Sequence, residues 1–235
     1  MVEYNIIGSS MQSLDVRLEP GERIYSDSGK FQSKSANVIM NPKFVGGVMG
    51  IISRKATGST AMLTEFEARK GEGMLSLSGT MPGKILGIDL KKDDEFVVEK
   101  YAFLAAEDTV GYSVQTLGLG AGFLGGEGFV LQKLRGPGKI FIHTVGDMLQ
   151  HDVTEDSPIH VEPGHIAGFD STLSFNVSLV DNVKTMLFGG IGLFMASFKG
   201  HGRLLLHSVS RYKMAAELFS QGLKYYSKNK GKYDQ

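Results

Sequence analysis

The sequence predicts an all-β domain of three β-sandwich-like repeats around a pseudo-threefold axis, followed by a C-terminal α-helix. Three observations predict it: short alternating apolar runs lie between glycines, two sequence landmarks each occur three times, and the apolar period changes after Ser210. The 235 residues are 42% hydrophobic and 21% charged, which is ordinary for a globular protein with its own core.

The first landmark is a basic residue, a Gly-x-Gly pair and two aliphatic residues in alternation. It occurs as KGEGMLSLSG from Lys70, RGPGKIFIHT from Arg135 and KGHGRLLLHS from Lys199, at offsets of about 65 and 64 residues. We expect each Gly-x-Gly pair to form a hairpin turn. Alternate residues of a strand share a face, so the aliphatic pairs predict the core side of three strands. These pairs are Leu75 and Leu77, Ile140 and Ile142, and Leu204 and Leu206.

The second landmark is LEPGE from Leu18, LKKDD from Leu90 and VEPGH from Val161, at offsets of about 72 and 71 residues. Pro-Gly at 20–21 and 163–164 suits a type II turn, whereas Lys92-Asp93 needs a different one. Residues 1–210 are therefore expected to form a single β domain of three repeats, at about 4–87, 88–157 and 158–210. Extra residues from Ser53 predict an extended hairpin in the first repeat.

Residues 211–235 predict an amphipathic helix followed by a polar tail. One apolar line runs from Tyr212 to Tyr226 at helical spacing, and a second contains Met214, Leu218 and Tyr225. Two lines favour contact with a partner subunit, and hence a homo-oligomer. The alternative is a helix that lies in a groove of its own domain.

The stretch GLGAGFLGGEG contains G-x-G-x-x-G at 120–125, a pattern typical of dinucleotide-binding loops. Such a loop needs a helix after it, whereas the residues that follow predict strand, turn and strand. Glycine-rich bends also occur at 46–50 and 189–192. We interpret the stretch as architecture and expect no cofactor.

The candidate binding residues are Ser78, His143 and His207, which stand at the same place after the three Gly-x-Gly pairs. Around a threefold axis they could converge on a small ligand or a metal. The alternative is that they end strands at a solvated rim. With no cysteine in the chain, sulfur-based zinc sites are excluded, and no metal ligand is assigned. The loop from His151 to His160 lacks a known ligand spacing.

Charge and motifs limit the function classes. Basic and acidic residues number 25 each, so the chain lacks the positive field of a general nucleic-acid binder; we expect no DNA partner and disfavour RNA. No Gly-x-Ser-x-Gly elbow is present, and we favour a non-enzymatic protein with no catalytic residues. No apolar run is long enough to span a membrane, and the N-terminus lacks a secretory signal. We expect a cytoplasmic protein that is not transmembrane.

Four segments carry a family resemblance: LEPGERIYSDSG, YAFLAAEDTV, GGEGFVLQKLRGPGKIFIHTVGD, and VEPGHIAGFDSTLSFNV followed by KTMLFGGIG. From about Tyr4 to Ser210 the chain resembles the altered-inheritance-of-mitochondria family, a group of largely uncharacterised prokaryotic proteins with mitochondrial relatives. The resemblance implies a fold like that of the tryptophan attenuation protein, a short double-stranded β-helix repeated in the chain. It implies no catalytic residues, and a shared fold does not transfer RNA binding.

The sequence therefore favours a non-enzymatic scaffold or assembly protein that acts through protein-protein contacts. One alternative is a small-molecule or metal-binding module at the pseudo-threefold centre, with Ser78, His143 and His207 lining it. RNA binding is a weaker third hypothesis.

Overall fold

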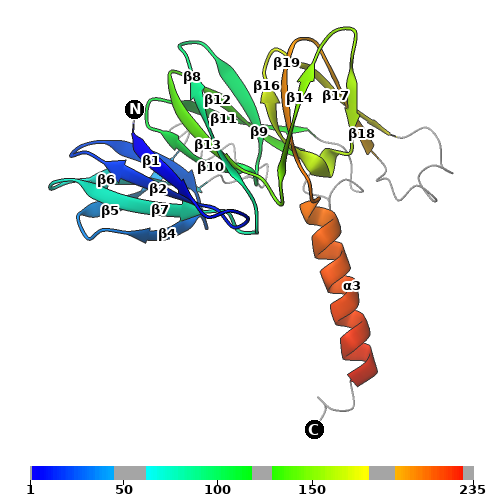
Figure 1. Ribbon diagram of the computed structural model, residues 1–235, viewed down its shortest axis with the longest axis horizontal. Coiled ribbons are helices and arrows are strands. Elements are labelled where there is room, and N and C mark those ends of the chain that lie inside the picture. Colours follow the sequence, from blue (N-terminus) through cyan, green and yellow to red (C-terminus); the bar gives the residue numbers. More distant parts are fainter. Residues whose placement is uncertain (1, 45–61, 118–128, 180–193, 230–235) are drawn as a thin grey trace.

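The computed structural model describes residues 2–44, 62–117, 129–179 and 194–229. Strands make up most of the described chain and form four antiparallel sheets, and a long helix, α3, extends from the β domain (Figure 1). The fold class predicted from the sequence is confirmed as all-β with a C-terminal helix.

The four sheets differ in size, and the strands of each sheet lie side by side in the order named. Sheet 1 contains β1 (Glu3–Ile7), β2 (Ser13–Leu18), β7 (Gly73–Ser78) and β4 (Phe31–Lys34). Sheet 2 contains β5 (Val38–Phe44), β6 (Met62–Ala68), β3 (Arg23–Asp27), β10 (Phe103–Glu107), β13 (Gly138–His143) and β8 (Ile85–Leu90). Sheet 3 contains β11 (Gly111–Leu117), β12 (Phe129–Arg135), β9 (Glu95–Glu99), β16 (Ile166–Asp170), β19 (Gly202–His207) and β14 (Met148–Val153). Sheet 4 contains β15 (Ile159–Val161), β18 (Phe194–Lys199) and β17 (Ser174–Leu179).

The two central sheets connect parts of the chain that are distant in sequence. We call residues 13–78, 85–143 and 148–207 the N-terminal, middle and C-terminal segments. Pairing of β3 with β10 joins the first two segments, and pairing of β9 with β16 joins the last two. We call these the first and the second interface. Among the described strands no sheet joins the N-terminal to the C-terminal segment. A threefold axis around a shared centre therefore stays a prediction.

The core face predicted from the first landmark is confirmed. All six aliphatic side chains are buried, and the most exposed of them, Leu206, has 8% of its surface exposed. In β13 and β19 the alternate residues Phe141 and Leu205 are buried as well. Both strands lie between two neighbours in a six-stranded sheet, and apolar residues cover both of their faces. The period-two alternation therefore predicted one buried face of β13 and β19, whereas both faces are buried.

The predicted Gly-x-Gly hairpins are wrong. In each case the strand before the glycines and the strand after them belong to different sheets: β6 and β7, β12 and β13, and β18 and β19. One glycine of each pair has a positive φ, as at Gly138 (138°), where a side chain would be strained. The glycines therefore let the chain cross from one sheet to the next.

The second landmark is correct at its first occurrence and wrong at its third. The amide of Glu22 donates to the carbonyl of Glu19 at 2.9 Å, and Gly21 has a φ of 86°, as a type II turn requires. The equivalent turn after β8 closes from Asp94 to Lys91, with Asp93 at a φ of 71°.

In the C-terminal segment, Pro163–His165 form a 3-10 helix, η2, instead of the predicted type II turn. The turn that follows β14 is Thr154–Ser157, where the Ser157 amide donates to the Thr154 carbonyl at 3.2 Å. The letters Glu-Pro-Gly thus recur at a different place in the fold.

The helix α3 spans Arg211–Asn229, as predicted. Figure 1 shows it extending away from the sheets. The alternative of a helix in a groove of its own domain is wrong, because Leu218, Phe219 and Leu223 are 63%, 69% and 53% exposed. No helix in the described part of the chain is long and apolar enough to cross a membrane.

Several predictions lie outside the described residues. They concern the glycine-rich bends at 46–50, 120–126 and 189–192, the insertion from Ser53, and the tail from 230. The strand expected after the second bend is β12.

Candidate functional site

The candidate residues Ser78, His143 and His207 occupy the same position in three strands. Each is the last residue of its strand, and each pairs with the first residue of a neighbouring strand, namely Ser13, Ile85 and Met148. The three residues therefore match both in their place after the first landmark and in their strand pairing.

His143 is buried where the N-terminal and middle segments meet. Its side chain is packed against the backbone of Gly79, the residue after Ser78: a Cβ atom on Gly79 would lie 2.1 Å from the ring. The His143 amide donates to the carbonyl of Ala102 at 2.7 Å. Burial lowers the pKa of His143 to about 4, with a smaller contribution from the Lys30 charge. At neutral pH the ring is uncharged.

His207 has a matching environment between the middle and C-terminal segments. Its Nδ1 accepts a hydrogen bond from the amide of Val145 at 3.0 Å, which fixes the orientation of the ring. The carbonyl of His207 lies 2.9 Å from Nδ1 of His165. Burial lowers the pKa of His207 to about 4, and the charges of His143, His165 and Arg211 act in the same direction. The two histidines are thus near enough to interact electrostatically.

The expectation of a solvated rim is wrong for both histidines. Only 3% of His143 and 5% of His207 is exposed, because the connections after β7 and β13 cover the strand ends. Ser78 is half-buried, and its amide donates to the Lys30 carbonyl at 2.9 Å. Among the described residues, no three His, Cys, Asp or Glu side chains form a group that could hold a metal ion.

Two buried charges beside the histidines were missed by sequence reasoning. Lys30 is 3% exposed, and its Nζ donates to the Tyr101 carbonyl at 3.2 Å. Glu99 is 6% exposed, and its Oε2 accepts from the Tyr101 amide at 2.8 Å. Burial raises the pKa of Glu99 to about 7 and lowers that of Lys30. A signal existed for Glu99, since a carboxylate within the apolar run EFVVEKYAFLAA has to find buried partners.

The first residue of α3 closes this cluster. The guanidinium carbon of Arg211 lies 3.0 Å from the centre of the Tyr101 ring and 5.0 Å from that of Tyr212. The charge of Arg211 also favours the ionised form of Glu99. We call Lys30, Glu99, Tyr101, Arg211 and the two histidines the polar cluster. It connects all three segments to the start of the helix.

The cavity described at the polar cluster is small. A cavity of about 10 Å³ lies against Glu99, Tyr101, His207 and Arg211. This is about the volume that one water needs. Its side chains therefore contact one another and the backbone, as in a packed structural core.

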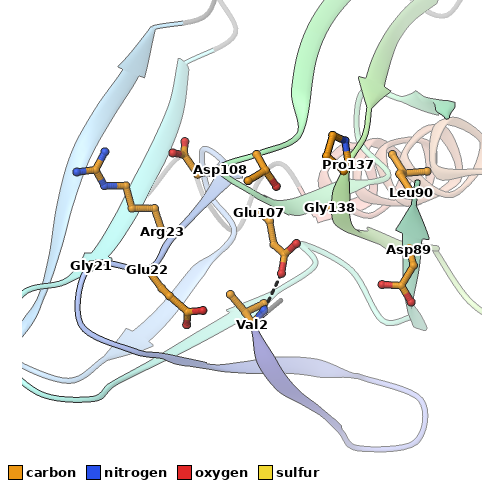
Figure 2. A pocket seen from close by; sticks show the side chains of 11 residues that line it. Val2, Gly21, Glu22, Arg23, Asp89, Leu90, Glu107, Asp108, Pro137 and Gly138 are labelled. Carbon is orange, nitrogen blue, oxygen red and sulfur yellow. Dashed lines mark hydrogen bonds between the residues drawn. The ribbon is translucent and has the colours of Figure 1, made fainter. Parts of the chain in front are cut away.

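A cleft with a volume of about 590 Å³ lies at the first interface. Its acidic groups bind parts of the same chain: Figure 2 shows the Glu107 carboxylate directed at the backbone nitrogen of Val2, at 2.6 Å. The second oxygen of Glu107 accepts from the Lys139 amide at 2.8 Å, Asp89 pairs with the Lys139 ammonium at 2.5 Å, and Asp108 pairs with Lys43. These contacts indicate that the acidic groups of the cleft stabilise the fold.

A smaller cleft of about 300 Å³ lies at the second interface. Its floor is apolar and its rim is polar. Sequence reasoning did not predict it.

Comparison with known proteins identifies relatives over almost the whole chain. A family model described as mitochondrial biogenesis AIM24 matches residues 4–209. An uncharacterised protein of Streptococcus pyogenes serotype M6 is 23% identical over 221 residues, covering 90% of this chain and 88% of that protein. A crystal structure of a Streptococcus pyogenes protein is similar with a TM-score of 0.77 and 21% identity, covering 96% of this chain and 100% of that one. At this identity the structural likeness shows the fold alone.

Proposed function

The chain belongs to the mitochondrial biogenesis AIM24 family, and we propose that it is a non-enzymatic scaffold or assembly protein that acts through protein-protein contacts. The observation that carries the proposal is the exposed apolar surface of α3. Leu218, Phe219 and Leu223 are each more than half exposed, which is unusual for large apolar side chains on one element.

The apolar residues of α3 gather on one side of the helix. At about 100° per residue, Leu218, Phe219 and Leu223 fall within one continuous apolar arc, together with Ala215 and Tyr226. The opposite side is polar and contains Lys213, Glu217, Ser220, Gln221, Lys224, Ser227 and Lys228. An arc of roughly half the circumference is wider than the seam of a two-stranded coiled coil and suits a helix in a bundle.

We propose that the partner is a second copy of the chain, so that α3 helices pack together in a homo-oligomer. The lysines lie opposite the apolar arc and would stay in solvent, so the like charges would not meet. The helix is also held at its base, where Arg211 stacks on Tyr101 and Lys213 pairs with Glu162 at 2.6 Å. A helix fixed to a rigid domain loses less conformational entropy on association.

We further propose that the three segments are structural repeats. A side-chain oxygen accepts from the second residue of the last strand in each segment: Ser35 from Met74 at 2.9 Å, Glu107 from Lys139 at 2.8 Å, and Asp170 from Arg203 at 2.7 Å. This shared bond and the three equivalent turns support repetition at the level of hydrogen bonding.

The alternative, a ligand or metal site lined by Ser78, His143 and His207, has less support because the cavity at the polar cluster is so small. RNA binding rests on fold analogy alone. The cytoplasmic location stays a prediction.

Light scattering after size-exclusion chromatography tests the proposal on the full chain. We expect the wild type to be oligomeric, and Leu218→Ser with Phe219→Ser and Leu223→Ser to lower the measured mass to that of a monomer. The matched control, Gln221→Ser with Lys224→Ser on the polar side, should keep the wild-type mass. A monomeric wild type, or a triple variant of unchanged mass, would contradict self-association through α3.

A further inference from the structure

The 300 Å³ cleft at the second interface has the composition of a small-molecule site. Side chains from β9, β12, β16 and the turn before β17 form a buried floor: Val97, Leu131, Phe169 and Leu173. Exposed Gln115, Ser171 and Asn176 stand at the rim. Ligand sites of this volume combine an apolar interior with a few polar groups in the same way.

The equivalent place at the first interface is filled by a side chain of the protein itself. In the first interface Tyr25 pairs with Ala106, and in the second Val97 pairs with Phe169. The next strand follows the same register, because Tyr25 pairs with Glu65 and Val97 with Lys133. Val97 therefore stands where Tyr25 stands, and it lines the cleft together with its paired residue Phe169, which takes the place of Ala106.

The surroundings of Tyr25 show what that place accepts. The ring is fully buried, 5.9 Å from the centre of the Phe103 ring and 6.2 Å from that of Tyr112. Its hydroxyl donates to the carbonyl of Val110 at 2.9 Å, and the Lys43 ammonium lies 4.7 Å from the ring centre. A phenol ring is thus bound on its apolar faces and through its hydroxyl.

The cleft offers counterparts of these contacts. Leu173 matches Val110, since each amide donates to the carbonyl three residues earlier, at 3.0 Å in both cases. Gln115, paired with Leu131, matches Lys43, paired with Leu63. Aromatic contact comes from Phe169 and Phe175, whose ring centres are 5.2 Å apart. The place of a cation is taken by a neutral amide, and Lys133 at the rim is paired with Glu95 at 3.6 Å.

We propose that this cleft binds a small, uncharged aromatic molecule with one hydroxyl group, in the place that Tyr25 occupies at the first interface. The apolar floor takes the ring, and the Leu173 carbonyl accepts the hydroxyl proton. The paired charges at the rim favour a neutral ligand over a carboxylate or an amine. The site is independent of α3 and of self-association.

The probe is p-cresol, which is the side chain of tyrosine as a free molecule. Titration into full-length protein, followed by methyl NMR, should give saturable shifts at Val97, Leu131 and Leu173, and none at the core methyl groups of Leu14 and Leu18. A molecule of this size is expected to bind with a dissociation constant on the order of 1 mM. Replacing the hydroxyl, as in 4-methylanisole, should weaken binding about fivefold through loss of the donor.

Val97→Tyr should fill the cleft and weaken p-cresol binding at least about tenfold. The matched control is Val130→Tyr, which makes the same change on the other face of neighbouring β12 and should leave binding unchanged. If Val97→Tyr does not fold, the methyl shifts of the wild type decide the question. Absence of saturable shifts there, or unchanged affinity in a folded Val97→Tyr protein, would overturn the proposal. So would much tighter binding of N-acetyltyrosinamide, which would indicate a partner's side chain instead.

Discussion

The two interfaces between segments share a backbone register and differ in what fills them. At the first interface Tyr25 is fully buried and its hydroxyl is bound, whereas at the second Val97 leaves a cleft of about 300 Å³. Both interfaces bury one histidine at a strand end, His143 and His207. The hydrogen-bonded frame therefore places Tyr25 and Val97 at equivalent positions. Their neighbours differ as well, since Tyr25 pairs with Ala106 and Val97 with Phe169.

The largest effect is expected from making the first interface like the second. Tyr25→Val removes a ring that is packed on all sides and should lower the free energy of unfolding by about 3–4 kcal/mol. Urea denaturation monitored by circular dichroism measures it. The control is Val97→Leu, a change next to an existing cleft, which should shift stability by less than about 1 kcal/mol. A loss below about 1 kcal/mol for Tyr25→Val would show that the first interface is not tightly packed.

Acid should destabilise both interfaces, because each of them buries one histidine. The pKa of each is lowered to about 4 in the folded state from an ordinary value of 6.5, so the unfolded chain binds more protons between these pH values. The stability from each histidine is complete above pH 6.5 and is lost as the pH falls to 4. Each should contribute about 3 kcal/mol to this loss.

Urea midpoints between pH 4 and 7 test the histidine prediction. His207→Gln should remove the contribution of His207, about 3 kcal/mol, from the acid-dependent loss, while the contribution of His143 and the opposing one of Glu99 remain. His151→Gln, at a solvent-exposed position, is the control and should keep the full pH dependence. An unchanged pH profile in His207→Gln would mean that the second histidine titrates normally.

Glu99 is expected to act in the opposite direction. Its pKa is raised from 4.5 to about 7 in the folded state, so the folded chain binds more protons between pH 4.5 and 7. Stability from this group is present below pH 4.5 and is lost as the pH rises to 7, by about 3 kcal/mol. Glu99→Gln keeps an acceptor for the Tyr101 amide and should remove this loss.

As the pH rises from 4.5 to 6.5, the free energy of unfolding of Glu99→Gln should therefore increase more steeply than that of the wild type. In the variant only the effect of the histidines remains. Glu162→Gln provides the control, because Glu162 is partly exposed and pairs with Lys213 outside the cluster. Parallel pH profiles for wild type and Glu99→Gln would show that Glu99 is ionised normally in the folded protein.

The sequence predicted what depends on local pattern. The alternation at Leu75 and Leu77 and the helical spacing after Ser210 report burial and period directly, and both predictions are confirmed. The type II turn predicted after Val161 is wrong, because Pro-Gly there is part of η2. The turn equivalent to those at Glu19–Glu22 and Lys91–Asp94 lies at 154–157 and contains no Pro-Gly.

The site depends on contacts that no local pattern contains. Lys30, Glu99 and Arg211 are far apart in the chain and meet only through the sheet pairing. Likewise, the second landmark aligns Tyr25 with Val97 at its offset of about 72 residues, but the letters of RIYSD and EFVVE do not show that one side chain is enclosed and the other lines a cleft.

The smallest effect isolates the hydroxyl at the first interface. Tyr25→Phe keeps the ring and removes the hydrogen bond from its oxygen to the Val110 carbonyl, leaving that buried acceptor without this donor. The free energy of unfolding should fall by about 1–2 kcal/mol, less than for Tyr25→Val. Because the cleft at the second interface is proposed to use the equivalent Leu173 carbonyl, the loss in Tyr25→Phe estimates what a ligand hydroxyl gains there. A neutral Tyr25→Phe substitution would imply that the ring alone provides recognition, and p-cresol and 4-methylanisole should then bind the cleft equally.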